Sequence, residues 1–159
     1  MAERTLDGFV RRSLAILEHE HPAGYRRLHA ALGRRRVELG LDGDPFVLAV
    51  AGARIRLEPA ASERACAAVE LGRATVVSIL DGEVELLDAL LADHLHVRGS
   101  IAELGELWDA TRLYLHGLIR CPSIPPLLDA LRAGDDHDAP SVDLVSTNRE
   151  NPRDQPDPP

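Results

Sequence analysis

The sequence contains no lysine, because all 18 of its basic residues are arginine. This absence excludes Schiff-base catalysis by a lysine and the phosphate-binding loop whose lysine contacts the phosphates. Aromatic residues are also scarce, with one Trp, two Tyr and two Phe among 159 residues. Because nucleic-acid binding needs a basic surface and stacking platforms, this scarcity and the net charge of -8 argue against a nucleic-acid partner.

Cysteines and long apolar runs are equally rare. Cys66 and Cys121 are isolated and form no Cys-x-x-Cys motif, and no secretory signal is recognisable. We therefore expect a reduced, cytoplasmic location. No apolar run approaches the roughly 20 residues that a membrane-spanning helix needs. The Gly-x-Ser-x-Gly motif of many serine hydrolases is missing too, so the sequence gives no cue for a nucleophile.

The charge that is present is distributed unevenly. Residues 1–36 hold eight arginines against four acids, whereas residues 134–159 hold seven acids against two arginines. The composition divides the chain into a helical segment at 1–33 that packs on the domain, a domain at 34–133, and a disordered, acidic, Pro-rich tail at 134–159. The basic N-terminal helices are either a solvated surface or a site of transient contact with anionic membranes.

Apolar residues follow a helical period first and a strand period afterwards. Residues 2–22 have the stripe of a helix that Pro22 ends, and residues 23–33 have that of a second helix ending at Gly33. Residues 34–59 alternate as three strands with turns at Asp42-Gly43 and Gly52, and 66–72 and 95–99 predict two more strands. Since most strands alternate, we expect helices on one face of the sheet and water on the other.

The segment between the last two predicted strands is ambiguous. "ATVVSI", residues 74–79, has the β-branched composition of a strand, but its apolar positions also suit one face of a helix. A second helix follows, with Val84, Leu87, Leu90 and Leu91 as its apolar positions. After the fifth strand, Ser100 and Glu103 have the spacing of a capping box, which predicts a long helix. Pro122 ends that helix, and residues 125–134 predict a last short one.

This order of elements resembles the sterol carrier protein 2 (SCP2) family. The most specific block is "SILDGEVELLDALLADHLHVRG", residues 78–99. It is similar to the family's Leu-rich helix ending in Leu-Leu-x-Gly-Glu-Leu, followed by a second helix and a Leu-x-Val-x-Gly strand. "FVLAVAGARIRLEPA", residues 46–60, resembles the second and third strands of the family. Ala92-Asp93-His94 replaces the usual small-Gly-Lys turn before the fifth strand.

The resemblance implies an α+β fold with an SCP2-like, five-stranded mixed sheet covered on one face by helices, with N-terminal and C-terminal helices. It also implies that residues 74–79 are helical. An apolar cavity between sheet and helices would hold a sterol, fatty acid, acyl-CoA or similar lipid. We therefore predict a protein that binds and carries an apolar small molecule. The predicted ligand-binding residues are Phe46, Leu48, Val50, Ile79, Leu87, Leu91, Leu104, Leu107, Trp108, Thr111 and Leu115.

Some of these features have a purely structural explanation. Any helix that covers a sheet shows an apolar stripe, so the stripe from Leu104 to Leu115 also fits core packing. His94 and His96 fit a polar surface, since a closed zinc site would need two further ligands that no nearby spacing offers. From the sequence we therefore expect no catalytic residue, no metal ligand and no cofactor.

Two alternatives to a carrier remain open. The cavity could host a cyclase-type or isomerase-type reaction on a polyketide-like or terpenoid substrate, with Asp109, Tyr114 or His116 as acid or base. The protein could instead be an accessory interaction module for a partner enzyme.

Overall fold

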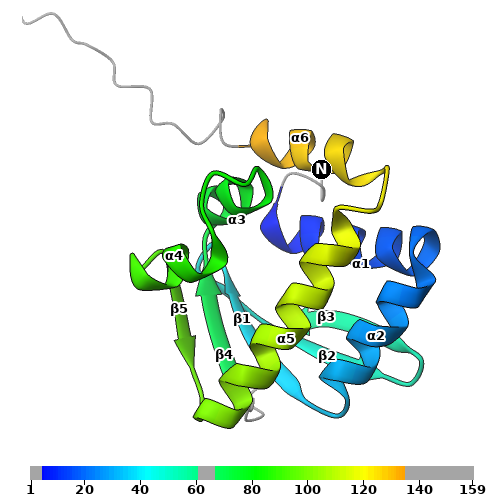
Figure 1. Ribbon diagram of the computed structural model, residues 1–159, viewed down its shortest axis with the longest axis vertical. Helices are drawn as coiled ribbons and strands as arrows, with labels where there is room; N and C mark the ends of the chain where they lie inside the picture. Colours follow the sequence, from blue (N-terminus) through cyan, green and yellow to red (C-terminus); the bar gives the residue numbers. More distant parts are fainter. Residues whose placement is uncertain (1–4, 61–66, 135–159) are drawn as a thin grey trace, which may run out of the picture.

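The computed structural model describes residues 5–60 and 67–134 of the chain (Figure 1). Within them, β1 (Arg36–Leu41), β2 (Asp44–Ala51), β3 (Arg54–Pro59), β4 (Ala67–Leu71) and β5 (Leu95–Arg98) form one sheet. The strand order is β3-β2-β1-β4-β5; β1 and β4 pair in parallel, and the other neighbours pair antiparallel. The predicted α+β class and five-stranded mixed sheet are thus confirmed. Cys66 and residues 135–159 of the predicted tail lie outside the described residues.

The alternation of residue types gives the sheet an apolar face and a charged face. The register places Leu48 of β2 between Val37 of β1 and Leu57 of β3, so these side chains form one row on the apolar face. Val37 and Leu57 are both deeply buried. On the opposite face, the side chains of Glu70 in β4 and Arg98 in β5 form an exposed ion pair. Helices therefore cover one face of the sheet, as its sequence predicts, and the other face carries charged side chains, although Val47 on that face is also buried.

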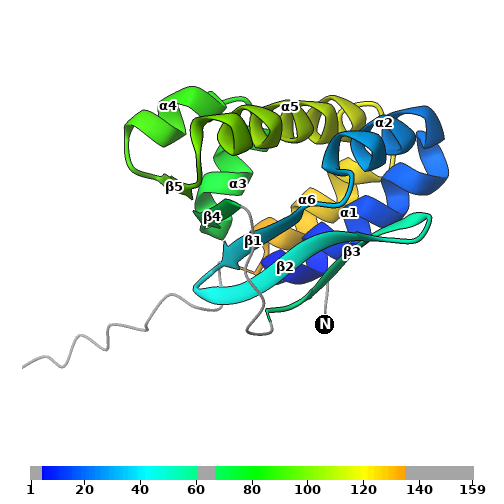
Figure 2. The ribbon, with the colours of Figure 1, turned by 90° about the horizontal axis from the view of Figure 1, so that it is seen from below.

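The helices gather over the apolar face (Figure 2). They are α1 (Leu6–Glu20), α2 (Pro22–Leu32), α3 (Arg73–Leu80), α4 (Leu86–Leu91), α5 (Ile101–Leu118) and α6 (Ile124–Arg132). Pro22 does not only follow the first helix but also begins the second, because a residue without an N–H suits the first helical position. Gly33 ends α2 with a φ of 56°, as predicted. No helix in the described part of the chain is long and apolar enough to cross a membrane.

Residues 74–79 are helical, as the family resemblance implies and against their strand propensity. The cap residue of α3, Gly72, has no side chain to accept a hydrogen bond from the first turn. Asp42, in the turn between β1 and β2, instead accepts a hydrogen bond of 2.7 Å from the Arg73 backbone N–H. A residue 31 positions earlier therefore supplies the acceptor that the helix start needs.

The next helix begins later than its apolar positions predict. α4 starts at Leu86, after Glu85 in an extended conformation, so Val84 precedes the helix. Its buried residue is Ala89, whereas Leu87 and Leu91 are 50% and 74% exposed. Asp93 then takes a left-handed φ of 58° at the position of the family's usual glycine, a conformation that Asp tolerates better than most residues.

The longest helix begins at the predicted capping box. Ser100 accepts a hydrogen bond from the Glu103 backbone N–H, and the Glu103 carboxylate accepts one from the Ser100 backbone N–H at 2.7 Å. Both reciprocal bonds of the motif are thus formed at the start of α5. The chain turns after Leu118, and α6 then packs against α1 and α3.

Candidate ligand-binding cavity

A cavity of about 490 Å³ lies between the apolar face of the sheet and the helices. Its walls come from α1 to α5 and from every strand except β3. Among the described residues that line it, none is charged, and only Trp108, Thr111 and Tyr114 carry a polar side-chain atom. Such a space can hold an apolar molecule without requiring a charged or metal partner.

Seven of the eleven predicted site residues line this cavity. Five of them lie on α5, whose stripe faces the sheet, and the other two come from β2 and α3. The seven residues are Leu48, Ile79, Leu104, Leu107, Trp108, Thr111 and Leu115. The stripe of α5 is therefore the element that brings most of the predicted residues together.

The structure does not place the other four at the cavity. Phe46 and Val50 share the apolar face of β2 with Leu48, but they pack against the core, and the Arg11 guanidinium lies 5.7 Å from the Phe46 ring centre. Leu87 and Leu91 point outward from α4 and are largely exposed. In their place, the neighbouring α4 residues Leu86 and Leu90 line the cavity.

Sequence reasoning missed the contribution of the first two helices. Phe9 and Leu14 of α1 and Leu28 and Leu32 of α2 all line the cavity. Their helical periodicity was visible in the sequence, and it identified a buried face for each helix. The side of the domain on which that face packs depends on contacts distant in the chain, which periodicity does not specify.

Two residues in the first turns of α5 both line the cavity and are exposed to solvent. Ile101 lines the cavity and is nevertheless 92% exposed, although a large apolar side chain usually avoids water. Gly105, one turn further along, is also both exposed and part of the wall. The wall of the cavity therefore reaches the protein surface at this end of α5.

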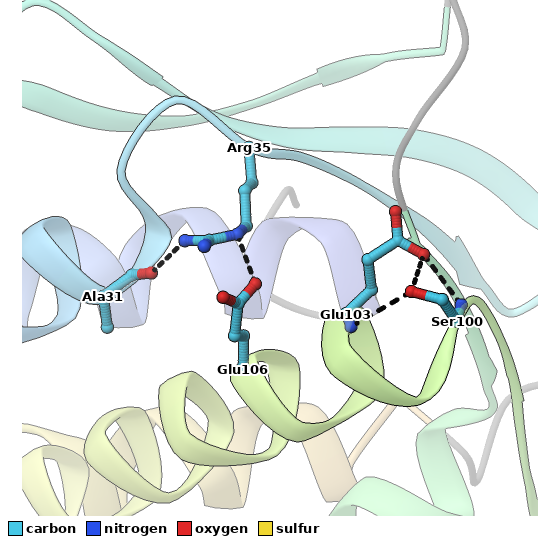
Figure 3. A network of polar contacts seen from close by, with 5 residues as sticks. All are labelled: Ala31, Arg35, Ser100, Glu103 and Glu106. Carbon is cyan, nitrogen blue, oxygen red and sulfur yellow. Dashed lines mark hydrogen bonds and ion pairs between the residues drawn. The ribbon is translucent and has the colours of Figure 1, made fainter.

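Polar contacts link α5 to the end of α2 and close its own first turn (Figure 3). The Arg35 side chain, just after α2, donates to the Ala31 carbonyl at 3.1 Å and forms an ion pair of 2.6 Å with Glu106 of α5. The Ser100–Glu103 capping box fixes the first turn of the same helix. None of these charged side chains lines the cavity, so the contacts place no charge inside it.

The three residues of the predicted acid–base alternative do not converge. Tyr114 lines the cavity, whereas Asp109 and His116 are exposed on α5. Burial raises the pKa of Tyr114 to about 12, although its hydrogen bond with Ser13 acts in the opposite direction. The Tyr114 hydroxyl therefore stays protonated at neutral pH and offers no base.

The described cysteine and histidine residues show no grouping for catalysis or metal binding. Burial, and secondly the Glu20 carboxylate, raise the pKa of the Cys121 thiol, which donates a hydrogen bond to the Gly117 carbonyl. His94 and His96 are exposed. Within residues 5–60 and 67–134, no three His, Cys, Asp or Glu side chains lie together as a set of metal ligands.

Comparison with known proteins finds similar solved structures but no similar family model or curated sequence. No family model matches the chain, and the search of curated proteins finds no match. The sterol carrier protein domain 2 of Helicoverpa armigera superimposes with a TM-score of 0.54 and 14% identity, over 72% of this chain and 91% of that one.

Two further structures are similar at lower scores. A sterol carrier protein 2 matches with a TM-score of 0.49 and 19% identity, over 69% of this chain and 92% of that one. A UbiJ-SCP2 ubiquinone synthesis protein matches with a TM-score of 0.49 and 12% identity, over 63% of this chain and 85% of that one. From the sheet order, the helices on one face and the likeness to the Helicoverpa armigera domain, the chain has the SCP2-like fold.

Proposed function

We propose that the protein binds and carries an apolar small molecule, such as a lipid, in the cavity under α5. The observation that carries this proposal is a cavity of about 490 Å³ whose described lining residues are uncharged and whose wall reaches the surface at Ile101. Each buried CH2 group contributes about 0.8 kcal/mol, so a ligand that buries about a dozen gains on the order of 10 kcal/mol before the costs of association. Affinity therefore needs no charged contact.

The residues in contact with the ligand follow from the same geometry. We propose the seven predicted residues that line the cavity, together with the wall contributed by α1, α2 and the inner face of the sheet. Phe46, Val50, Leu87 and Leu91 are not part of this proposed site, because they do not line the cavity. The SCP2-like fold supports the proposal, since the similar Helicoverpa armigera structure is a sterol carrier protein domain.

A pair of matched substitutions tests the site. Leu107→Glu places a charge in the cavity wall, among described residues that carry no charge, and should reduce the uptake of a fluorescent fatty acid at least tenfold. Leu91→Glu makes the same change on α4, at a position that is 74% exposed and outside the wall. That variant should bind the fatty acid as the unaltered protein does. Fluorescence titration measures both affinities.

The control is the fold of each variant, monitored by circular dichroism and thermal unfolding. Equal uptake by folded Leu107→Glu and Leu91→Glu variants would contradict the site. Failure of the unaltered protein to bind fatty acids, fatty alcohols or hydrocarbons would contradict the carrier function itself.

We also propose transient contact with anionic membranes through the basic N-terminal helices. Arg26 and Arg27 are exposed on α2, where they can reach a surface, whereas Arg11 and Arg35 form ion pairs with Asp7 and Glu106. A cytoplasmic location is part of the same proposal, in which the protein exchanges its ligand with a membrane surface.

A further inference from the structure

One short helix has large apolar side chains on opposite sides. α4 contains four leucines in six residues, and Asp88 is its polar residue. Leu86 and Leu90 line the cavity, whereas Leu87 and Leu91 are 50% and 74% exposed. A helix that is apolar all round is normally buried on every side. The described part of the chain covers only one side of α4.

The exposed leucines share their side of the helix with acidic residues. Leu87, Leu91 and Asp88 span about 100° of the helix circumference, because successive residues are about 100° apart. Glu85 and Asp93 flank the helix, and both are exposed. Neither of them, nor Asp88, forms an ion pair within the described part of the chain. These five residues are called the α4 surface below.

The composition around this surface narrows its partner. Among the described residues, four large apolar side chains are half or more exposed, and two of them lie on α4. Single exposed leucines are ordinary, but neighbouring ones mark interaction sites. Residues 74–97 hold five acids and no arginine. A partner must therefore offer apolar side chains together with positive charge.

A surface hollow of about 460 Å³ adjoins the end of α4. Leu90 and Asp93 line one part of it, and β5 and Glu70 line the rest. Glu70 forms an ion pair with Arg98 in the same hollow, so Asp93 is the carboxylate that remains for an incoming cation. A long basic side chain suits this place, because its apolar stem can lie on Leu90 while its charge reaches Asp93.

Charge and burial argue against four other occupants. A second copy that docks through the same surface would bring like carboxylates together, and an anionic membrane would repel them. Residues 135–159 hold seven acids against two arginines, so they carry the same sign. The basic helices α1 and α2 of a second copy have the opposite sign. However, none of the exposed large apolar side chains of the described residues lies on those helices.

We propose that the α4 surface binds a cationic amphipathic helix of another protein. Leu87 and Leu91 lie one turn apart and form a ridge that packs between the apolar side chains of a facing helix. Basic residues beside that apolar stripe then pair with the three acids of the surface. Since the other side of α4 lines the cavity, the partner contacts the cavity wall from outside. This inference goes beyond the proposed carrier function and does not rest on it.

The test uses a synthetic peptide of about 20 residues that forms a helix with one leucine stripe and arginines on both sides of the stripe. A matched peptide carries glutamate in place of each arginine. Fluorescence anisotropy measures the affinity of the full-length protein for both peptides. The arginine peptide should bind roughly tenfold tighter or more, and added salt should reduce the difference.

Substitution of both leucines tests the apolar part of the surface. The double variant Leu87→Gln, Leu91→Gln should bind the arginine peptide roughly tenfold more weakly, since it loses the apolar area that the peptide covers. The matched control is Ile119→Gln at the end of α5, because Ile119 is as exposed as Leu91, at 74%. That control should bind the peptide as the unaltered protein does. Circular dichroism checks the fold of each variant.

A second pair of variants tests the acidic part. Asp88→Asn combined with Asp93→Asn should weaken binding of the arginine peptide roughly two- to tenfold. Asn suits position 93, because it tolerates the left-handed φ of 58° found there. Asp44→Asn combined with Glu58→Gln removes two charges from β2 and β3, on the far side of the sheet from β5, and should leave the affinity unchanged.

Fatty-acid uptake separates this inference from the carrier function. The double leucine variant should keep that uptake, whereas Leu107→Glu should lose it and still bind the arginine peptide. If the unaltered protein takes up no fatty acid but shows the expected pattern of peptide binding, the carrier function is wrong and the α4 surface is supported.

Three results would overturn the proposal. The first is equal affinity for the arginine and glutamate peptides, and the second is unchanged affinity in the double leucine variant. The third is another occupant: analytical ultracentrifugation of the unaltered protein shows a dimer, or flotation shows binding to phosphatidylcholine vesicles, and the double leucine variant loses that association.

Discussion

Glu103 shows how one exposed carboxylate contributes to stability. Hydrogen bonds from the Ser100 backbone N–H and then from its hydroxyl lower the pKa of Glu103 below its usual value. Because the folded state binds this proton more weakly than the unfolded state does, protonation favours unfolding. The stabilisation is therefore present above the carboxyl pKa of the unfolded chain and is lost as the pH falls through the lower pKa of the folded state.

This sign leads to a prediction for the variant Glu103→Gln. At neutral pH its melting temperature should be lower than that of the unaltered protein, since the amide lacks the charge that strengthens both hydrogen bonds and favours a helix start. As the pH falls and Glu103 is protonated, the two melting temperatures should converge. Calorimetric scans across the acidic range measure the difference. A constant difference at all pH values would show that the carboxylate charge contributes nothing.

At the residue scale, the sequence predicts local hydrogen-bonding motifs better than it predicts which apolar side chains line the cavity. Ser100 and Glu103 were recognisable because all partners of a capping box lie within four residues. The cavity wall was not fully predictable, since Phe46 and Leu48 have the same character and face but only Leu48 lines the cavity. An apolar side chain looks the same in a sequence whether it fills a core or borders a space.

At the element scale, two glycines of α5 lie in very different packing environments. A Cβ atom at Gly117 would lie 2.5 Å from Cδ1 of Leu17 in α1, a side chain that is fully buried. A Cβ atom at Gly105 would meet nothing within 4 Å. Both positions lie within α5, where alanine is favoured over glycine, so they differ mainly in the neighbour that a methyl group meets.

The two alanine variants should therefore change stability in opposite directions. Gly105→Ala should stabilise the protein by about 0.5–1 kcal/mol through helix propensity. Gly117→Ala gains the same contribution, but displacing Leu17 in a packed interior costs about 1–3 kcal/mol, so the variant should be less stable. Urea unfolding monitored by circular dichroism measures both free energies. An equal increase in both variants would mean that Leu17 can move aside freely.

The helices also show where prediction from sequence ends. The strands alternate, so their residues alone indicate them. The start of α3 depends on Asp42, whose carboxylate accepts a hydrogen bond from the Arg73 N–H, and no local pattern reveals this contact. In α4 the predicted apolar positions Val84, Leu87, Leu90 and Leu91 imply one continuous helix, but the extended conformation of Glu85 delays its start. Of these positions Leu90 lines the cavity, together with Leu86, whereas Leu87 and Leu91 are exposed.

At the scale of the whole molecule, α6 closes the core. It buries Ile124, Leu127, Leu128 and Leu131, each no more than 7% exposed, and it packs against α1 and α3. Burial of one such side chain contributes about 1.5–3 kcal/mol, so the four together contribute on the order of 6–12 kcal/mol. Because a domain is usually stable by only about 5–15 kcal/mol, the fold should depend on this helix.

The large contribution of α6 predicts the results of two truncations. The same truncations test the proposed boundary between the domain and the tail at residue 134. A chain that ends after Gly134 keeps α6 and loses a segment with seven acids and two arginines, and its melting temperature and hydrocarbon binding should be unchanged. A chain that ends after Ser123 loses α6, so the apolar surface of α1 and α3 would be exposed to water and the protein should not unfold cooperatively. Thermal scans followed by circular dichroism distinguish the two. A large loss of stability in the first truncation would mean that the acidic segment is part of the domain, because its few apolar residues, Val142, Leu144 and Val145, would then have to be buried.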